Sequence, residues 1–140
     1  MTTNRKTFRN INALTDLPSY RLPAAGWVSI LHRISGAVMF ILLPFILWIF
    51  DRSLTSELSY EGLTASFAQG VGVVPGAALK LVALVLLWAF LHHLFAGVRH
   101  LIMDATHRVT KGFGRSSAQA TLVLSLALTA LLGAKLFGLY

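Results

Sequence analysis

Several ionisable side chains stand inside an apolar stretch, residues 81–104, that is typical of a membrane-spanning helix. The stretch begins as an uninterrupted apolar run. It then contains five polar or charged side chains: His92, His93, Arg99, His100 and Asp104. Because such groups are costly to bury in a bilayer, an intramembrane ionisable residue is by default a candidate functional site. At 3.6 residues per turn, His93, His100 and Asp104 share one helix face.

The face of His93 has the features of an axial haem site. Ala89, Ala96 and Gly97 place small side chains beside His93. An axial haem ligand on a transmembrane helix needs a neutral imidazole nitrogen aimed at the iron and a backbone set back to admit the macrocycle. The alternative is structural: His93 hydrogen-bonds a neighbouring helix, and Gly97 allows helices to pack closely. The stretch alone does not separate the two.

His92 is a rival for the ligand role. Neighbouring residues of an α-helix point about 100° apart, so His92 and His93 face different surroundings. His92 points toward a bulkier face, formed by Trp88, Phe95, Ala96 and Arg99. Arg99 itself is expected as a positively charged anchor near the inner membrane surface.

A second polar cluster lies near the start of the first apolar span. Ser29, His32, Arg33 and Gly36 fall at positions i, i+3, i+4 and i+7, so a hydroxyl, an imidazole and a guanidinium face the same way. These groups can bind an oxygen-bearing ligand. The structural alternative is that Ser29 caps the helix while Arg33 extends to lipid phosphates.

The composition places the chain among integral membrane proteins. It has 140 residues, of which 56% are hydrophobic, and a mean hydropathy of +0.71. It has no cysteine, so it supplies neither a disulfide nor thiolate ligands for an iron–sulfur cluster. The net charge of +7 is carried by residues that flank apolar runs, which favours topology signals and lipid contacts over nucleic-acid binding.

The expected fold is all-α, with three transmembrane helices at about 27–50, 77–103 and 118–140. A basic N-terminal arm over residues 1–26 precedes them, and it lacks the continuous apolar run of a secretory signal. Pro44 should kink the first helix. Residues 51–76 and 104–115 are expected as loops, and the third helix shows no residue with obvious chemistry.

The distribution of charge predicts the topology. The arm and the second loop are basic and the first loop is slightly acidic, so we expect the N-terminus in the cytoplasm and the C-terminus outside. The start of the first helix and the end of the second then meet at one membrane face. His93 would lie about 10 Å deeper than His100, and haem propionates could reach Arg33, His32 or His100.

Two motifs together resemble those of the cytochrome b membrane-anchor subunit of succinate dehydrogenase, respiratory Complex II. The first runs Ser29-Ile30-Leu31-His32-Arg33-Ile34-Ser35-Gly36. The second runs His93-x-x-x-Gly97-Val98-Arg99-His100-Leu101-Ile102-Met103-Asp104. Both occur in the family's order, at the expected ends of the first two spans. The Arg-Pro-Leu-Ser-Pro-His opening of many members is missing from the arm.

The resemblance implies roles for particular residues. His93 would be the axial ligand of one haem b, whose other ligand comes from a second membrane subunit. Ser29 and Arg33 match ubiquinone-binding positions, and His32, Arg33, His100 and Asp104 would serve the haem propionates or support the ligand. Electrons would come from succinate through soluble flavoprotein and iron–sulfur subunits. The expected location is a bacterial inner membrane.

Other functions remain open at this level. A quinol:fumarate reductase anchor is the nearest alternative, and a purely structural anchor without a cofactor is another. A proton or ion relay through His93, His100 and Asp104 would need polar groups that continue to the outer face. The apolar run over residues 81–91 argues against such a path.

Overall fold

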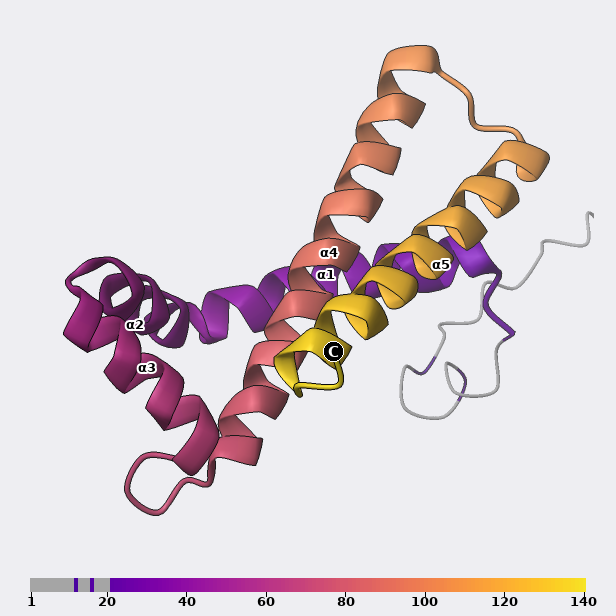
Figure 1. The fold of residues 1–140 in the computed structure, drawn as a ribbon. Coiled ribbons are helices and arrows are strands. Elements are labelled where there is room, and N and C mark those ends of the chain that lie inside the picture. Colours follow the sequence, from indigo (N-terminus) through magenta and orange to yellow (C-terminus); the bar gives the residue numbers. More distant parts are fainter. Residues whose placement is uncertain (1–11, 13–15, 17–20) are drawn as a thin grey trace, which may run out of the picture.

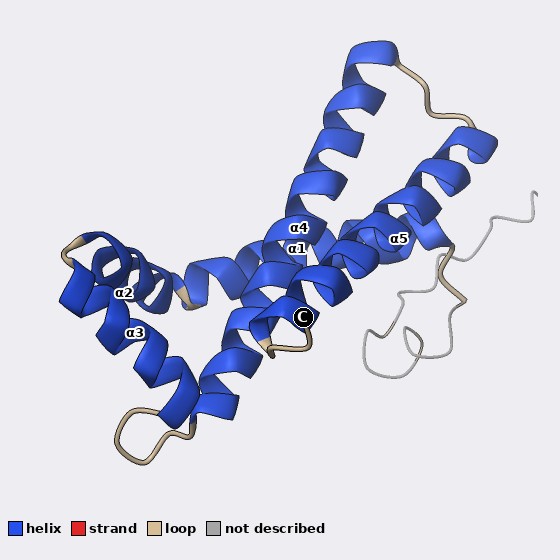
Figure 2. Ribbon diagram, viewed as in Figure 1, coloured by secondary structure: helices blue, strands red, loops and turns tan. Residues whose placement is uncertain are grey.

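The computed structural model describes residues 12, 16 and 21–140, and this part of the chain is almost entirely helical (Figures 1 and 2). The only β pairing in it is an isolated bridge between Val71 and Val74. The expected all-α class is therefore confirmed. Most of the predicted arm lies outside the described residues. The five helices are α1 (Ala24–Ile41), α2 (Leu43–Leu54), α3 (Glu57–Gln69), α4 (Gly76–Thr106) and α5 (Lys111–Leu136).

Three of these helices, α1, α4 and α5, are long and apolar enough to cross a membrane. The second span agrees closely with the predicted bounds. The third begins seven residues earlier than expected, because Thr110 caps α5 by accepting a hydrogen bond from the Phe113 N–H. Gly112 and Gly114, which fall within the predicted second loop, lie inside the first turns of α5. The predicted second loop therefore shrinks to residues 107–110.

The first span is interrupted where Pro44 predicts a disturbance. Helix α1 ends at Ile41, and α2 begins at Leu43 with Pro44 in its first turn. Proline has no N–H to donate to the carbonyl one turn earlier, so one bond of the ladder is lost. The bonds on either side survive: the Leu42 N–H donates to Val38 O, and the Ile46 N–H donates to Leu42 O, both at 3.0 Å.

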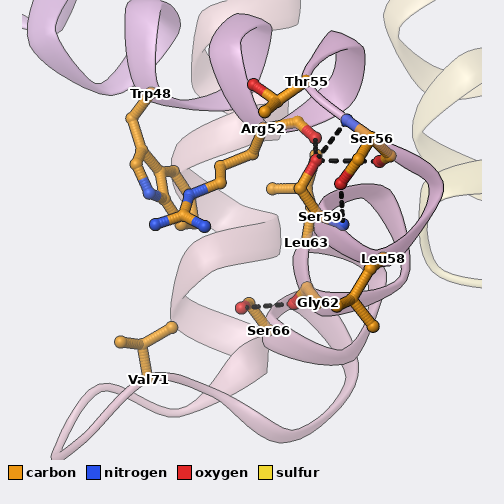
Figure 3. A pocket seen from close by; sticks show the side chains of 10 residues that line it. All are labelled: Trp48, Arg52, Thr55, Ser56, Leu58, Ser59, Gly62, Leu63, Ser66 and Val71. Atoms are coloured by element: carbon orange, nitrogen blue, oxygen red, sulfur yellow. Dashed lines mark hydrogen bonds between the residues drawn. The ribbon is translucent and has the colours of Figure 1, made fainter.

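The expectation of a loop over residues 51–76 is wrong. Helix α2 continues to Leu54, and α3 follows almost at once. A reciprocal cap starts α3, because the Ser56 hydroxyl accepts from the Ser59 N–H while the Ser59 hydroxyl accepts from the Ser56 N–H (Figure 3). The helix stops at Gly70, whose φ of 103° is poorly accessible to other residues.

Helix α4 is the central element of the membrane domain, since it packs against both α1 and α5 (Figure 1). Val28 of α1, Ala96 of α4 and Ala118 of α5 form a fully buried cluster where the three helices meet. Small side chains at such contacts let helix backbones approach closely in a membrane, where the hydrophobic effect does not drive helices together. This packing fixes how α4 is rotated, and so which histidine meets which neighbour.

Candidate functional site

Histidines from the two predicted clusters come together between α1 and α4. The rings of His32 and His93 stack with their centroids 4.0 Å apart and their planes 18° from parallel. The His100 ring is tilted against His32 at a centroid distance of 5.3 Å. Three predicted site residues from two helices therefore form a single imidazole cluster.

The hydrogen bonds of His93 leave one ring nitrogen open. Its Nδ1 lies 3.1 Å from the carbonyl oxygen of His32 and 3.3 Å from Oγ of Ser35. A carbonyl oxygen only accepts, so Nδ1 carries a proton, and in the neutral ring Nε2 presents its lone pair. That Nε2 has no hydrogen bond to any described residue, and it is not among the buried unpaired atoms. This is the arrangement of a metal-binding histidine, with one nitrogen held by the protein and the other available.

The small residues around the cluster differ from the expectation. A Cβ atom at Gly97 would lie 3.6 Å from Nε2 of His32, an ordinary van der Waals distance, so Gly97 faces a histidine of α1. Ala89 and Ala96 are fully buried in the bundle. They lie about one turn from both His92 and His93, and their burial places them among the packed helices.

His92 faces the inside of the three-helix bundle. Its side chain is completely buried, its Nδ1 lies 3.3 Å from Oγ of Ser125 on α5, and its ring stacks on Trp88. The predicted orientation toward Trp88 is thus confirmed. A large planar ligand would have to separate α4 from α5 to reach this imidazole, whereas His93 lies at the edge of the bundle.

Ser29, Arg33 and Asp104 make no hydrogen bond or ring contact with the histidine cluster, although Ser29 and Arg33 are its neighbours on α1 in the described chain. Ser29 is partly buried within α1, and it cannot cap a helix whose N-cap residue is Pro23. The capping alternative is therefore wrong. Arg33 and Asp104 are exposed on the surface of the chain, and their side chains make no hydrogen bond or ion pair with other described residues.

Arg99 joins two helices. Its side chain is only 7% exposed; Nε donates to Oγ of Ser117 at 3.0 Å, and Nη2 donates to the carbonyl oxygen of Gly114 at 3.3 Å. The expectation of a simple surface anchor is therefore incomplete, because the guanidinium connects α4 to the start of α5 and replaces water with protein acceptors.

Sequence reasoning missed the polar stripe of α5. The stripe consists of small and hydroxyl-bearing residues at every fourth position of the helix, so its members share one face. It supplies hydrogen-bond partners to both His92 and Arg99. The regular spacing of small residues could have revealed it. Its members are Ser117, Thr121, Ser125, Thr129 and Gly133.

Comparison with known proteins agrees with this architecture. Residues 6–132 match the family described as the succinate dehydrogenase/fumarate reductase transmembrane subunit. The chain belongs to this family. It is 34% identical over 118 residues to the succinate dehydrogenase cytochrome b556 subunit of Coxiella burnetii, covering 84% of this chain and 90% of that one.

Two further relatives carry similar names. The succinate dehydrogenase cytochrome b556 subunit of Paracoccus denitrificans is 31% identical, over 82% of this chain and 83% of its own. The cytochrome b560 subunit of Reclinomonas americana is 35% identical, over 64% of this chain and 60% of its own. The family resemblance drawn from the two motifs is thereby confirmed. The chain is a multi-pass membrane protein whose relatives are subunits of an oxidoreductase complex.

Proposed function

We propose that this chain is the haem b- and quinone-binding anchor of a succinate:quinone oxidoreductase, and that it passes electrons from the iron–sulfur subunit to ubiquinone. One observation carries the proposal beyond family membership. His93 Nδ1 is hydrogen-bonded to the carbonyl oxygen of His32, at 3.1 Å, and Nε2 is left without a partner among the described residues. The cytochrome b names of the relatives support the same assignment.

The donor set fits one axial ligand of a haem. His93 would hold the iron through Nε2, and a histidine of a second membrane subunit would supply the other ligand. When bound, haem b supplies a one-electron redox centre inside the membrane. Nε2 of His32 is buried without a hydrogen bond among the described residues, which costs free energy unless a polar group joins it. His32, Arg33, His100 and Asp104 are the residues we assign to the propionates and the surroundings of the ligand.

Ser29 and Arg33 are the proposed quinone-binding residues. Both lie on α1 close to His32, and the Ser29 hydroxyl can donate a hydrogen bond to a quinone carbonyl oxygen. The Arg33 guanidinium is exposed and unpaired within the described chain, so it is free to stabilise negative charge that develops on that oxygen. The side that carries Arg33 would then face the partner subunits in the assembled complex.

The proposed partner subunits supply the electron-transfer groups that this chain has no residues to bind. Without cysteine it cannot bind an iron–sulfur cluster, so electrons must reach it from a separate iron–sulfur subunit fed by a flavoprotein. The charge pattern supports an orientation with the N-terminus and the quinone-binding end at the cytoplasmic face, and the membrane we propose is a bacterial inner membrane. The family also covers fumarate reductases, so a quinol:fumarate reductase anchor is the second candidate.

Replacement of His93 tests the proposal. In the purified complex, His93→Ala should perturb or remove the haem band of the reduced-minus-oxidised spectrum while membrane insertion persists. His92→Asn is the matched control, because asparagine retains a polar group near Ser125, and it should keep the haem band. An unchanged spectrum in His93→Ala would rule out the ligand assignment.

A further inference from the structure

Three polar atoms form a closed hydrogen-bonded triangle where α1 meets α4. Ser35 Oγ donates to the carbonyl oxygen of His32 at 2.9 Å, and His93 Nδ1 lies 3.1 Å from that oxygen and 3.3 Å from Ser35 Oγ. Ser35 is completely buried. Among the described residues, its hydroxyl contacts the other two corners of the triangle, a backbone carbonyl and a ring nitrogen.

Only one placement of protons satisfies all three contacts. The Ser35 hydroxyl has one proton, and at 2.9 Å it is donated to the His32 carbonyl. Nδ1 of His93 must then carry its own proton, shared between the carbonyl oxygen and a lone pair of Ser35 Oγ. In the opposite tautomer, the bare Nδ1 would face the carbonyl oxygen at 3.1 Å, and two lone pairs would repel each other. In the neutral ring, the triangle thus leaves Nε2 of His93 as the nitrogen that carries the lone pair.

The surrounding residues also restrict rotation of the His93 ring. The His32 imidazole stacks on one side of it at a centroid distance of 4.0 Å. Gly36 lies at its edge, since a Cβ atom there would be 3.1 Å from Cε1 and 3.4 Å from Nδ1 of His93. The ring therefore has a defined plane as well as a defined tautomer.

We infer that Ser35 is a positioning residue for the redox centre: its hydroxyl oxygen is the second acceptor of the His93 Nδ1–H, beside the His32 carbonyl, and through this contact it helps to hold the imidazole and tunes the haem held by Nε2. The inference rests on the proposed ligand role of His93. A hydrogen-bond acceptor at Nδ1–H increases the electron density that an imidazole donates to a metal, which stabilises the oxidised iron and lowers its midpoint potential. The residue acts through His93 and touches no reacting atom.

The test compares Ser35→Ala with Ser35→Thr in the purified complex. Alanine removes the hydroxyl, so one of the two acceptors at Nδ1–H is lost. We expect the haem to remain bound, with its midpoint potential shifted to a more positive value and the g-values of its low-spin ferric signal changed. Threonine keeps a hydroxyl at the same position and should restore the wild-type potential and signal.

Each outcome decides the inference. An unchanged or negatively shifted potential in Ser35→Ala overturns it, and so does an equal shift in the alanine and threonine variants, because the hydroxyl would then not be the cause. Loss of haem in Ser35→Ala together with retention in Ser35→Thr supports it. Failure of the proposed function has a different signature, namely an unaltered haem spectrum in His93→Ala.

Discussion

The two neighbouring histidines of α4 lie in opposite environments. His92 is fully buried against α5, where Ser125 binds its Nδ1 and Trp88 covers its ring. His93 is partly buried against α1, where a backbone carbonyl binds its Nδ1. Nε2 has no partner among the described residues in either ring, but only that of His92 is buried. One step along the helix, about 100° of rotation, separates a residue that holds helices together from one that can hold a cofactor.

The difference lies in what the neighbouring helix offers. Helix α5 presents hydroxyl groups from its polar stripe, and these pair with His92 and Arg99 inside the bundle. Helix α1 presents Ser35, Gly36 and a stacked imidazole at the edge of the bundle. Changes on the α1 side should therefore alter redox behaviour, and changes on the α5 side should alter stability alone.

The largest effect is expected at Arg33 on the α1 side. Arg33→Leu should slow quinone reduction on the order of a hundredfold, as expected when a group that stabilises developing negative charge is removed. Succinate oxidation with an artificial acceptor should change little, because Arg33 is exposed and makes no bond that the fold requires. Arg33→Lys keeps the charge and serves as the control. Equal loss in both assays would indicate failed assembly instead.

A smaller effect is expected at Arg99 on the α5 side. Arg99→Leu removes two hydrogen bonds and leaves the Gly114 carbonyl without its guanidinium donor, at a cost of about 1–3 kcal/mol. The measurement is thermal unfolding of the purified complex, with the haem spectrum recorded alongside. A fall in Tm with an unchanged haem potential is the predicted result. A changed potential at unchanged Tm would contradict the division between the two sides.

The smallest effect is expected at Ser125. Ser125→Ala removes the partner of His92 Nδ1, and hydrogen bonds between membrane helices contribute about 0.6 kcal/mol on average. Thr129→Ala is the control, since Thr129 donates only to Ser125 O within α5. Combined with His92→Leu, Ser125→Ala should cost almost nothing more. A full additive loss in the double variant would show that the two side chains do not interact.

The sequence predicts the fold wherever apolar runs are long. The three crossing helices follow from hydrophobic length, and the interruption near Pro44 follows from its missing N–H. Helix α3 escaped prediction because residues 57–69 have weak periodicity and many small side chains. Only the Ser56-x-x-Ser59 capping pattern indicates where it starts.

The site was predicted in part, because helix periodicity shows which residues share a face but not which helix that face meets. Helix periodicity correctly grouped His93 with His100 and placed His92 toward Trp88. It could not show that Gly97 faces His32, that Ala96 packs in the core or that Arg99 binds α5. Those contacts depend on how three helices rotate against one another, and small residues spaced along each helix decide that rotation.

The most direct measurement of the central claim is chemical rescue at His93. In His93→Gly, the low-spin haem spectrum of the purified complex should be lost or altered, and added imidazole should restore it by occupying the vacated ligand position. His92→Gly should keep the low-spin spectrum without imidazole. A wild-type low-spin spectrum in His93→Gly before imidazole is added would contradict the account.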